Sequence, residues 1–255
     1  LHGIPLADTH YAKAEHGWAD YLAYGAMPAI VDSTVSHAEK HDWLQDYIRT
    51  YLQRDVRDLG NMRELEPFVR AQKSLAALSG QLLNVSELAK QAGITTLTAK
   101  RFISYLEISY QAIQLAPWFR NLNKRLSKSP KVHFLDPGIQ RVLLNRTGTF
   151  TGHEFESAVV AEIYKQIKTH ALAVDCFHLR TVDGREVDLL LELENGYIAI
   201  EVKMSAHVSA ADARHLHDLA DLLDKPLLHA LVVSNDPQVQ QWGNVMAVPV
   251  AWLLG

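Results

Sequence analysis

The sequence predicts a mixed α/β protein, α+β overall, because helical and strand-like patterns occupy different parts of the chain. Apolar residues recur at three- and four-residue spacing up to about residue 60, which indicates amphipathic helices. Residues 61–120 contain two helical patterns separated by a tight turn. From about residue 150 the patterns follow the order αβββαβ. We therefore expect three segments, at residues 1–60, 61–148 and 149–255.

The first segment is expected to be helical. In HDWLQDYIRTYLQRDVRDL, residues 41–59, the apolar side chains share one helical face and charged side chains occupy the other. Upstream, Gly25 and Pro28 in YGAMPAIV predict a loop, because neither residue favours a helix interior.

The second segment carries the signals of a helix-turn-helix. Asn84 is placed to cap a helix over NVSELAKQAG, Glu87 is its expected capping-box partner, and Gly93 is placed to end the helix in a left-handed conformation. A second helical pattern, ITTLTAKRFISYLE, follows at once. ISYQAIQLAP and KVHFLD then alternate like two strands. These features predict a winged helix-turn-helix.

Cations in this segment are candidates for nucleic-acid contacts. The second helix would present Lys100 and Arg101 to a DNA groove, although such a module also serves in packing or subunit contacts. The stretch RNLNKRLSKSPK contains no acidic residue. Its candidates for phosphate contacts are Lys124, Arg125, Lys128 and Lys131. A solvated loop explains this stretch equally well, and the net charge of −4 means that any basic surface is local.

The stretch GREVDLLLELENGYIAIEVK, residues 184–203, carries the strongest chemical signal. Asn195-Gly196 predicts a tight turn between two strands, whose register can place Asp188 beside Glu201 on one face. Two adjacent carboxylates repel each other and require a cation, for which Mg²⁺ or Mn²⁺ suits oxygen ligands. Lys203, on the face of Glu201, could orient or deprotonate a water or offset phosphate charge. Together these residues predict metal-dependent phosphodiester hydrolysis, whereas solvated strand charges are the simpler alternative.

The pattern resembles the PD-(D/E)xK nuclease superfamily, whose fold is restriction-endonuclease-like. In that superfamily an Asp ends one strand and E-x-K follows on the next, which matches Asp188, Glu201 and Lys203. The resemblance implies an additional acidic or polar residue from the first helix. The candidates are Glu156, then Glu154, with Gln166 as a further polar candidate. Many members keep the fold without activity, so the alternative function is a nucleic-acid or protein binding module that does not cut and that regulates or assembles a parent ATPase.

An ordered set of motifs extends the resemblance from about residue 20 to 205. YGAMPAIV, YIRTYLQRDV, NVSELAKQAGITTLTAKRFISYLE, KRLSKSPKVHFLDPGI, GHEFESAVVAEI and REVDLLLE…IAIEVK resemble the C-terminal part of prokaryotic AAA+-type ATPases that carry the domain of unknown function 4143. Residues 1–60 would then be the tail or lid of the ATPase region. The P-loop is absent, since Gly-Lys never occurs, so ATP is expected only in a full-length parent. Arg54 could serve a neighbouring nucleotide site, or pair with Asp55 or Asp58.

Composition predicts a cytoplasmic protein. The single cysteine, Cys176, excludes an internal disulfide, and no apolar run reaches the ~18 residues of a membrane span. The first residues lack the basic start and apolar core of a signal peptide. Leu1 in place of Met suggests a fragment or a processed chain. DNA, RNA, protein partners and self-association all remain open as partners.

Overall fold

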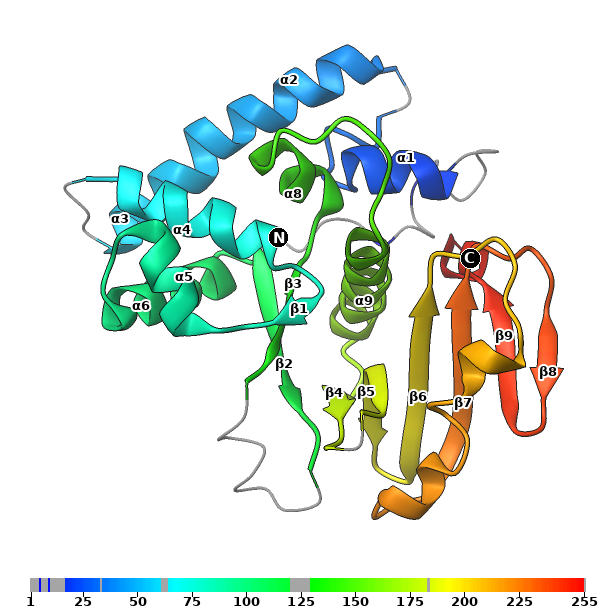
Figure 1. The fold of residues 1–255 in the computed structure, drawn as a ribbon. Helices are drawn as coiled ribbons and strands as arrows, with labels where there is room; N and C mark the ends of the chain where they lie inside the picture. The colour runs from blue at the N-terminus through cyan, green and yellow to red at the C-terminus, as the bar shows by residue number, and fades with distance from the viewer. Residues whose placement is uncertain are drawn as a thin grey trace.

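The structure, a computed structural model, describes residues 5, 9, 17–32, 34–60, 64–119, 129–182 and 184–254. It confirms a mixed α/β protein built around a nine-stranded mixed sheet. The N-terminal helices pack at one end of this sheet, and the C-terminal strands form the other end (Figure 1). Within the described part of the chain, no helix is both long and apolar enough to cross a membrane.

The described part of the first segment is mainly helical, as expected. Its elements are α1 (Gly17–Tyr24), α2 (His37–Tyr47), a π-helical turn η3 (Ile48–Leu52) and α3 (Gln53–Gly60). Elements α2 to α3 form one nearly continuous helix in which Leu44, Ile48 and Val56 are buried. The predicted amphipathic helix is therefore confirmed, with a π-helical turn in its middle that periodicity alone did not indicate.

The described part of the second segment contains four helices and three strands. They are α4 (Glu66–Ala77), β1 (Gln81–Leu82), α5 (Val85–Ala92), α6 (Thr96–Ile108), β2 (Ala112–Pro117), β3 (Lys131–Phe134) and α8 (Pro137–Leu143). The Asn84 side chain accepts hydrogen bonds from the backbone N–H groups of Ser86 and Glu87, and Gly93 ends α5 with φ of 67°. Both predicted ends of α5 are thus confirmed, but the expected capping box is not formed, since the Glu87 side chain accepts a hydrogen bond from Gln91. Strands β2 and β3 pair antiparallel, as their alternating patterns predicted.

The third segment supplies the long helix and most of the sheet. Its helix and strands are α9 (Gly152–Thr169), β4 (Asp175–Arg180), β5 (Glu186–Leu193), β6 (Gly196–Lys203), β7 (Leu227–Ser234), β8 (Gln240–Trp242) and β9 (Val245–Pro249). The β5–β6 hairpin is confirmed, but its two-residue loop is Glu194-Asn195, because Gly196 already pairs with Leu193. A side chain at Gly196 would collide with the Pro226 carbonyl, so close strand packing explains this glycine.

The αβββαβ order includes a helix expected over SAADARHLHDLADLLD, residues 209–224, and this expectation is wrong. Only short 3₁₀ turns form there, at Ala210–Ala213 and Leu219–Leu222. Asp218 adopts a left-handed conformation with φ of 54°, which interrupts any α-helix. The preceding carbonyl, that of His217, accepts a hydrogen bond from Arg185 Nη1 on the neighbouring strand connection (2.9 Å). Tertiary contacts therefore override the helical spacing of the apolar residues in this stretch.

One sheet runs through the second and third segments, in the order β1-β3-β2-β4-β5-β6-β7-β9-β8. The junction is short: β2 and β4 pair in parallel through Ala116 with Phe177 and Pro117 with His178. The Trp118 N–H extends it by donating to the His178 carbonyl (2.7 Å). The sequence patterns of the two segments did not indicate this continuity, because strand pairing across sixty residues leaves no local signal.

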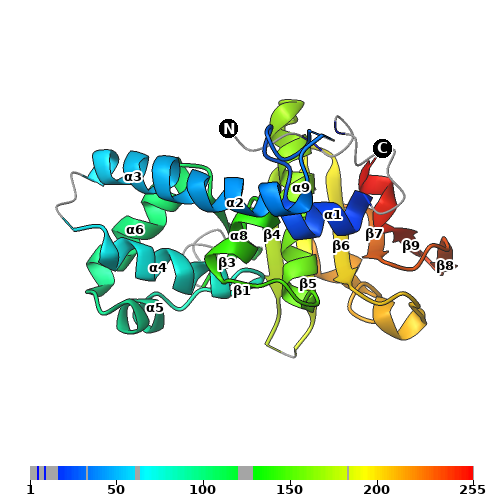
Figure 2. The ribbon, with the colours of Figure 1, turned by 90° about the horizontal axis from the view of Figure 1, so that it is seen from above.

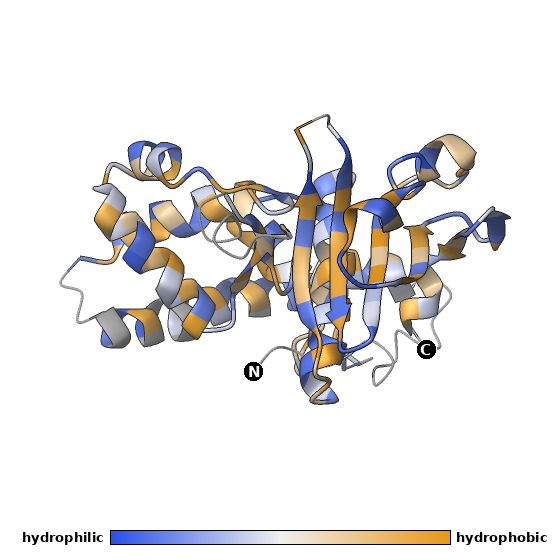
Figure 3. Cartoon of the chain, turned by 90° about the horizontal axis from the view of Figure 1, so that it is seen from below, coloured by the Kyte–Doolittle hydropathy of each residue, from blue (hydrophilic) through white to orange (hydrophobic). Residues whose placement is uncertain are grey.

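The third-segment part of the sheet is covered on both faces. Helices α1 and α9 pack on one face, where Phe155 and Val159 meet Leu189 and Ile200 (Figure 2). The connection that contains Leu216 and the two 3₁₀ turns packs on the opposite face. Figure 3 shows the apolar residues alternating along the central strands that these layers cover. Burial on both faces makes the strand side chains sensitive to register.

We expect the substitution Tyr197→Phe to weaken the junction between the segments. The Tyr197 hydroxyl accepts from Trp118 Nε1 (3.1 Å) and donates to Asp224 (2.7 Å), and both aromatic side chains are buried. Removing the hydroxyl takes this acceptor away from the indole N–H. Urea denaturation should show a loss of about 1–3 kcal/mol in the free energy of unfolding. Trp118→Phe provides the double-mutant cycle, and strictly additive losses would contradict the coupling.

Candidate functional site

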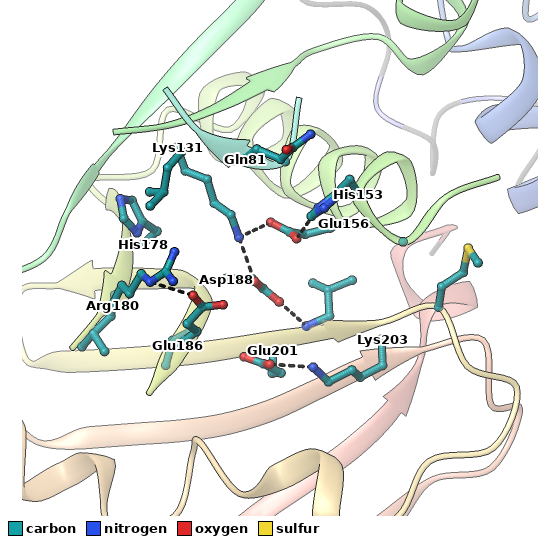
Figure 4. A pocket seen from close by; sticks show the side chains of 17 residues that line it. Gln81, Lys131, His153, Glu156, His178, Arg180, Glu186, Asp188, Glu201 and Lys203 are labelled. Atoms are coloured by element: carbon teal, nitrogen blue, oxygen red, sulfur yellow. Dashed lines mark hydrogen bonds and ion pairs between the residues drawn. The ribbon is translucent and has the colours of Figure 1, made fainter. Parts of the chain in front are cut away.

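A cavity of about 710 Å³ lies between the β1–β3 strands of the second segment and the sheet and first turns of α9 in the third (Figure 4). Residues from both segments line it: Gly80, Gln81, Leu82, Lys131, Gly152, His153, Glu156, His178, Leu179, Arg180, Glu186, Val187, Asp188, Glu201, Val202, Lys203 and Met204. Its wall includes all four residues that the sequence singled out for catalysis.

Helix α9 delivers Glu156 to this cavity. The helix begins at a capping box in which the Thr151 and Glu154 side chains exchange hydrogen bonds with each other's backbone N–H groups. Glu156 is therefore placed in the first turns of α9, pointing toward Asp188 and Lys131 (Figure 4). Because the helix start is well defined, the side chain enters the cavity in a fixed direction.

The two weaker helix candidates lie elsewhere. Glu154 is buried against Arg141 (2.9 Å) and lies 3.5 Å from Arg146. Gln166 donates to Glu162 (3.0 Å) and to the Leu253 carbonyl (3.3 Å). Neither lines the cavity. Of the three candidates from this helix, only Glu156 therefore lies with the hairpin residues.

A β-bulge aims Asp188 toward α9. Asp188 and Leu189 of β5 lie opposite the single residue His178 of β4, because the register shifts between Phe177 and Leu179. The bulge breaks the expected alternation: Val187 and Leu190 both pack on the face opposite α9, although they are three residues apart. Strict alternation along β5 would place Asp188 on the same face as Leu190, and this expectation is wrong because of the bulge.

The bulge also ends the ladder between β5 and β6. The last pair toward the cavity is Leu189 with Ile200. Beyond it, the Asp188 carboxylate accepts a hydrogen bond from the Val202 N–H (2.9 Å). The carboxylate thus bridges the point where the two strands separate, which fixes its position with respect to β6.

Lys131 is the unexpected member of the site. Its ammonium lies 2.5 Å from Glu156 Oε1 and 2.9 Å from Asp188 Oδ1 (Figure 4). All three side chains are largely buried, with 13%, 11% and 10% of the Lys131, Glu156 and Asp188 side chains exposed. The sequence assigned this lysine to a phosphate contact in a basic stretch. The structure instead gives it two carboxylate partners inside the cavity.

Glu201 has different neighbours from Asp188. One of its oxygens pairs with Lys203 Nζ (2.7 Å) and lies 3.8 Å from His215 Nδ1. The other oxygen, Oε2, is buried and has no hydrogen-bond partner among the residues that the structure describes. A buried carboxylate oxygen without a partner is costly, so this atom is open to a ligand that carries positive charge.

Burial and mutual repulsion perturb the carboxyl groups. Burial, followed by the charge of Asp188, raises the pKa of Glu156 to about 8 and that of Glu201 to about 7. For Lys131, burial opposes the charged form, but Asp188 and Glu156 together outweigh it and raise the pKa. Burial likewise opposes the charge of Lys203, and Glu201 outweighs it, so the pKa is raised. Both lysines are therefore cations held beside acidic partners.

Several residues around the site carried no sequence signal. They are His153, whose Nδ1 is 4.0 Å from Glu156, His215 beside Glu201, the Arg180–Glu186 pair (2.9 Å), and His178. Burial, and then the charge of Lys131, lower the pKa of His178 to about 4, which keeps this imidazole neutral at neutral pH. Only the strand order brings these side chains together, so no local motif could have identified them.

The remaining candidates for nucleic-acid contacts lie away from the cavity or outside the described residues. Lys100 and Arg101 are exposed on α6. Lys124, Arg125 and Lys128 fall outside the residues that the structure describes. Arg54 is exposed on α3. Of these cations predicted to contact nucleic acid, the described structure therefore includes Lys100 and Arg101, on the exposed face of α6.

The carboxylates fit a hard divalent cation by their chemistry. Asp188 and Glu201 both line the cavity, and the unpartnered Glu201 oxygen offers a free ligand atom. Asp188 and Glu201 do not form a complete metal site by themselves. Among the described residues, no three His, Cys, Asp or Glu side chains are grouped closely enough to hold a metal ion. Closing a metal site would therefore require side chains to move or waters to complete the coordination.

Comparisons with known proteins agree with part of the resemblance. Residues 15–149 match the family described as Domain of unknown function (DUF8612), and residues 151–253 match Domain of unknown function (DUF4143). Uncharacterized protein Rv2008c of Mycobacterium tuberculosis and Uncharacterized protein Mb2031c of Mycobacterium bovis are each 27% identical over 263 residues. These matches cover 100% of this chain but 56% of each relative, so the chain spans about half the length of these curated relatives.

One solved structure also shows similarity. Protein VC1899 from Vibrio cholerae is 18% identical, with 80% of this chain and 53% of that chain covered, at a TM-score of 0.30 that transfers no feature to this chain. The expected relation to domain of unknown function 4143 is confirmed for residues 151–253, whereas the preceding residues match a separate family. The chain thus belongs to the DUF8612 family, whose match covers more than half of it, and carries a DUF4143 domain at its C-terminal side.

Proposed function

We propose that this chain is the nucleic-acid-processing part of a longer AAA+-type ATPase-family protein, and that its cavity hydrolyses phosphodiester bonds in DNA or RNA. The observation that carries the proposal is the convergence of Glu156, Asp188, Glu201 and Lys203 in one cavity. They come from α9, β5 and β6, as in a PD-(D/E)xK nuclease-like arrangement of helix and hairpin.

Asp188 and Glu201 are the residues that would hold Mg²⁺ or Mn²⁺. Such an ion, when bound, supplies positive charge for the phosphate and lowers the pKa of a bound water. Asp188 is already oriented by the Val202 N–H, and Glu201 keeps one oxygen free. Different protein groups therefore hold Asp188 and Glu201, the Val202 N–H and the Lys203 ammonium, and both carboxylates line the same cavity.

Lys203 is best suited to stabilising charge. Of the two roles suggested by the sequence, deprotonating a water requires a neutral amine, but the raised pKa of Lys203 keeps its ammonium protonated. A third of the Lys203 side chain is exposed, and the residue lines the cavity. Its ammonium can therefore contact a phosphate oxygen while it stays beside Glu201. An ammonium in this position offsets the negative charge that develops on phosphorus oxygens.

Glu156 supports the site as a proton-holding group. A carboxyl group with a pKa of about 8 is mainly protonated at neutral pH, and can donate a proton as well as accept one. Glu156 and Asp188 both pair with the Lys131 ammonium, so the protonation state of Glu156 also changes the net charge around Asp188. We assign it an assisting role rather than a metal contact.

The second segment is proposed to position the nucleic acid. The order α4–β1–α5–α6–β2–β3 with β3 between β1 and β2 supports a winged helix-turn-helix, and Lys100 and Arg101 are exposed on α6. The same face could instead contact a protein partner or a second copy. Residues 1–60 would form the tail of an ATPase region, and ATP would bind only to the full-length parent.

One observation favours a second candidate function, a module that binds without cutting. Lys131 already neutralises Glu156 and Asp188 in the cavity. A site whose carboxylates are satisfied by a lysine can keep its fold and hold a nucleic acid or a protein without metal chemistry. The two functions differ in whether phosphodiester cleavage depends on Asp188.

We expect the purified chain to cleave linear, circular or single-stranded nucleic acid with Mn²⁺ or Mg²⁺, and Asp188→Asn and Lys203→Met each to reduce the rate about 100-fold or more. Asp188→Asn removes the charge of a ligand while keeping its shape, and Lys203→Met removes the ammonium. Gel assays of cleavage on each substrate class measure both effects.

Glu192→Gln is the matched control for this assay. Glu192 lies on the same strand as Asp188 but pairs with Lys225 (2.9 Å) and does not line the cavity. It should cleave like the parent. If the parent chain leaves every substrate intact, or if all variants cleave equally, the module that binds without cutting becomes the favoured function.

We expect Glu156→Gln to gain stability relative to the parent as pH rises. The folded parent keeps the Glu156 proton up to a pKa of about 8, whereas the unfolded chain releases it near its ordinary value of 4.5. The folded state binds more protons in this interval, so the free energy of unfolding of the parent falls from about pH 5 to about pH 8 relative to the variant. Denaturant titrations across this range measure the difference, with Glu192→Gln as control. A difference in the free energy of unfolding that does not change with pH would contradict the raised pKa of Glu156.

A further inference from the structure

We propose that Lys131 is a built-in counter-cation that competes with a divalent metal for the carboxylates of the cavity, so that metal binding displaces its ammonium. This inference rests on the proposed metal-dependent site. It assigns a role to a residue that lies within residues 15–149, outside the DUF4143 domain that contributes Glu156, Asp188 and Glu201.

The first support is the position of the ammonium. Lys131 Nζ contacts Asp188 Oδ1 at 2.9 Å, and Asp188 is the carboxylate to which the hairpin pattern assigns the metal. The second oxygen of Asp188 is engaged by the Val202 N–H. A metal on Asp188 would therefore approach the oxygen that Lys131 occupies, where a monovalent and a divalent cation repel each other strongly.

The second support is the charge balance. The acidic side chains of Glu156, Asp188 and Glu201 share the cavity with the ammonium groups of Lys131 and Lys203, while Glu186 and Arg180 in its wall pair with each other. Without Lys131, Glu156 and Asp188 would lose the cation that they share, because the Lys203 ammonium pairs with Glu201. The lysine therefore stabilises the metal-free site, and a metal ion can take over this task because it carries more charge.

The third support is the freedom of the side chain. The Lys131 backbone is fixed, since it pairs with Leu82 of β1 and with Leu115 of β2. Its four-carbon side chain ends in a cavity of about 710 Å³. The ammonium can therefore swing away from Asp188 within this space while β3 stays in the sheet.

The test measures Mn²⁺ binding to the whole chain without substrate, by titration calorimetry and by the electron paramagnetic resonance signal of free Mn²⁺. Lys131→Met should bind Mn²⁺ at least about tenfold more tightly than the parent, because the competing charge is gone. The matched control is Lys225→Met, which breaks the Lys225–Glu192 ion pair outside the cavity and should leave the affinity unchanged.

A charge-balanced pair of variants protects the test against poor folding. Lys131→Met leaves Glu156 and Asp188 without their shared cation, whereas Lys131→Met with Glu156→Gln removes one charge of each sign. The double variant should bind Mn²⁺ at least about tenfold more tightly than Glu156→Gln alone. Its thermal unfolding temperature should also rise more on adding Mn²⁺ than that of Glu156→Gln.

Equal or weaker Mn²⁺ binding after loss of Lys131 would overturn the competition. Absence of Mn²⁺ binding to every variant would overturn it as well, because no metal then competes. Neither outcome is the same as failure of the proposed hydrolysis, which is judged by cleavage and its dependence on Asp188. Cleavage with unchanged Mn²⁺ affinity would leave the hydrolysis standing and remove only the role of Lys131.

Discussion

The contact of the Lys131 ammonium with Glu156 and Asp188 is the interaction on which the arrangement of the site depends. Buried carboxylates cannot share a cavity in their ionised form without a cation between them. Burial, and then the charge of Asp188, raise the pKa values of Glu156 and Glu201, so both carboxyl groups resist ionisation in the metal-free cavity. A ligand with additional positive charge would favour their ionised forms.

The backbone supports this electrostatic arrangement through one irregularity. The bulge at Asp188 and Leu189 turns the carboxylate toward α9 and separates the ends of β5 and β6. In a regular strand Asp188 would point to the face that carries Leu190, away from Glu156. The extra residue therefore brings a helix carboxylate and a strand carboxylate to the same ammonium, and it opens the gap through which the Val202 N–H reaches Asp188.

Local chemistry made part of this structure predictable. The N-cap at Asn84, the left-handed Gly93 and the amphipathic helix through Leu44 and Ile48 follow from neighbouring residues, and all three are confirmed. The hairpin motif correctly placed Glu201 and Lys203 on one side of β6. The bulge at Asp188 and the helix expected around residue 218 were missed, because both depend on contacts with distant segments that override local spacing.

The position of Lys131 shows why the site cannot be understood from the DUF4143 domain alone. Lys131 belongs to the preceding family region, and its strand reaches the cavity through the pairing of β2 with β4 and through contacts of Ser79 and His133 with Ser157 of α9. The placement of the ammonium therefore depends on how firmly the second segment is docked. A partner or nucleic acid that shifts the β1–β3 strands would move the Lys131 backbone with them. The electrostatics of the carboxylates in the third segment are thereby coupled to the contacts of the second.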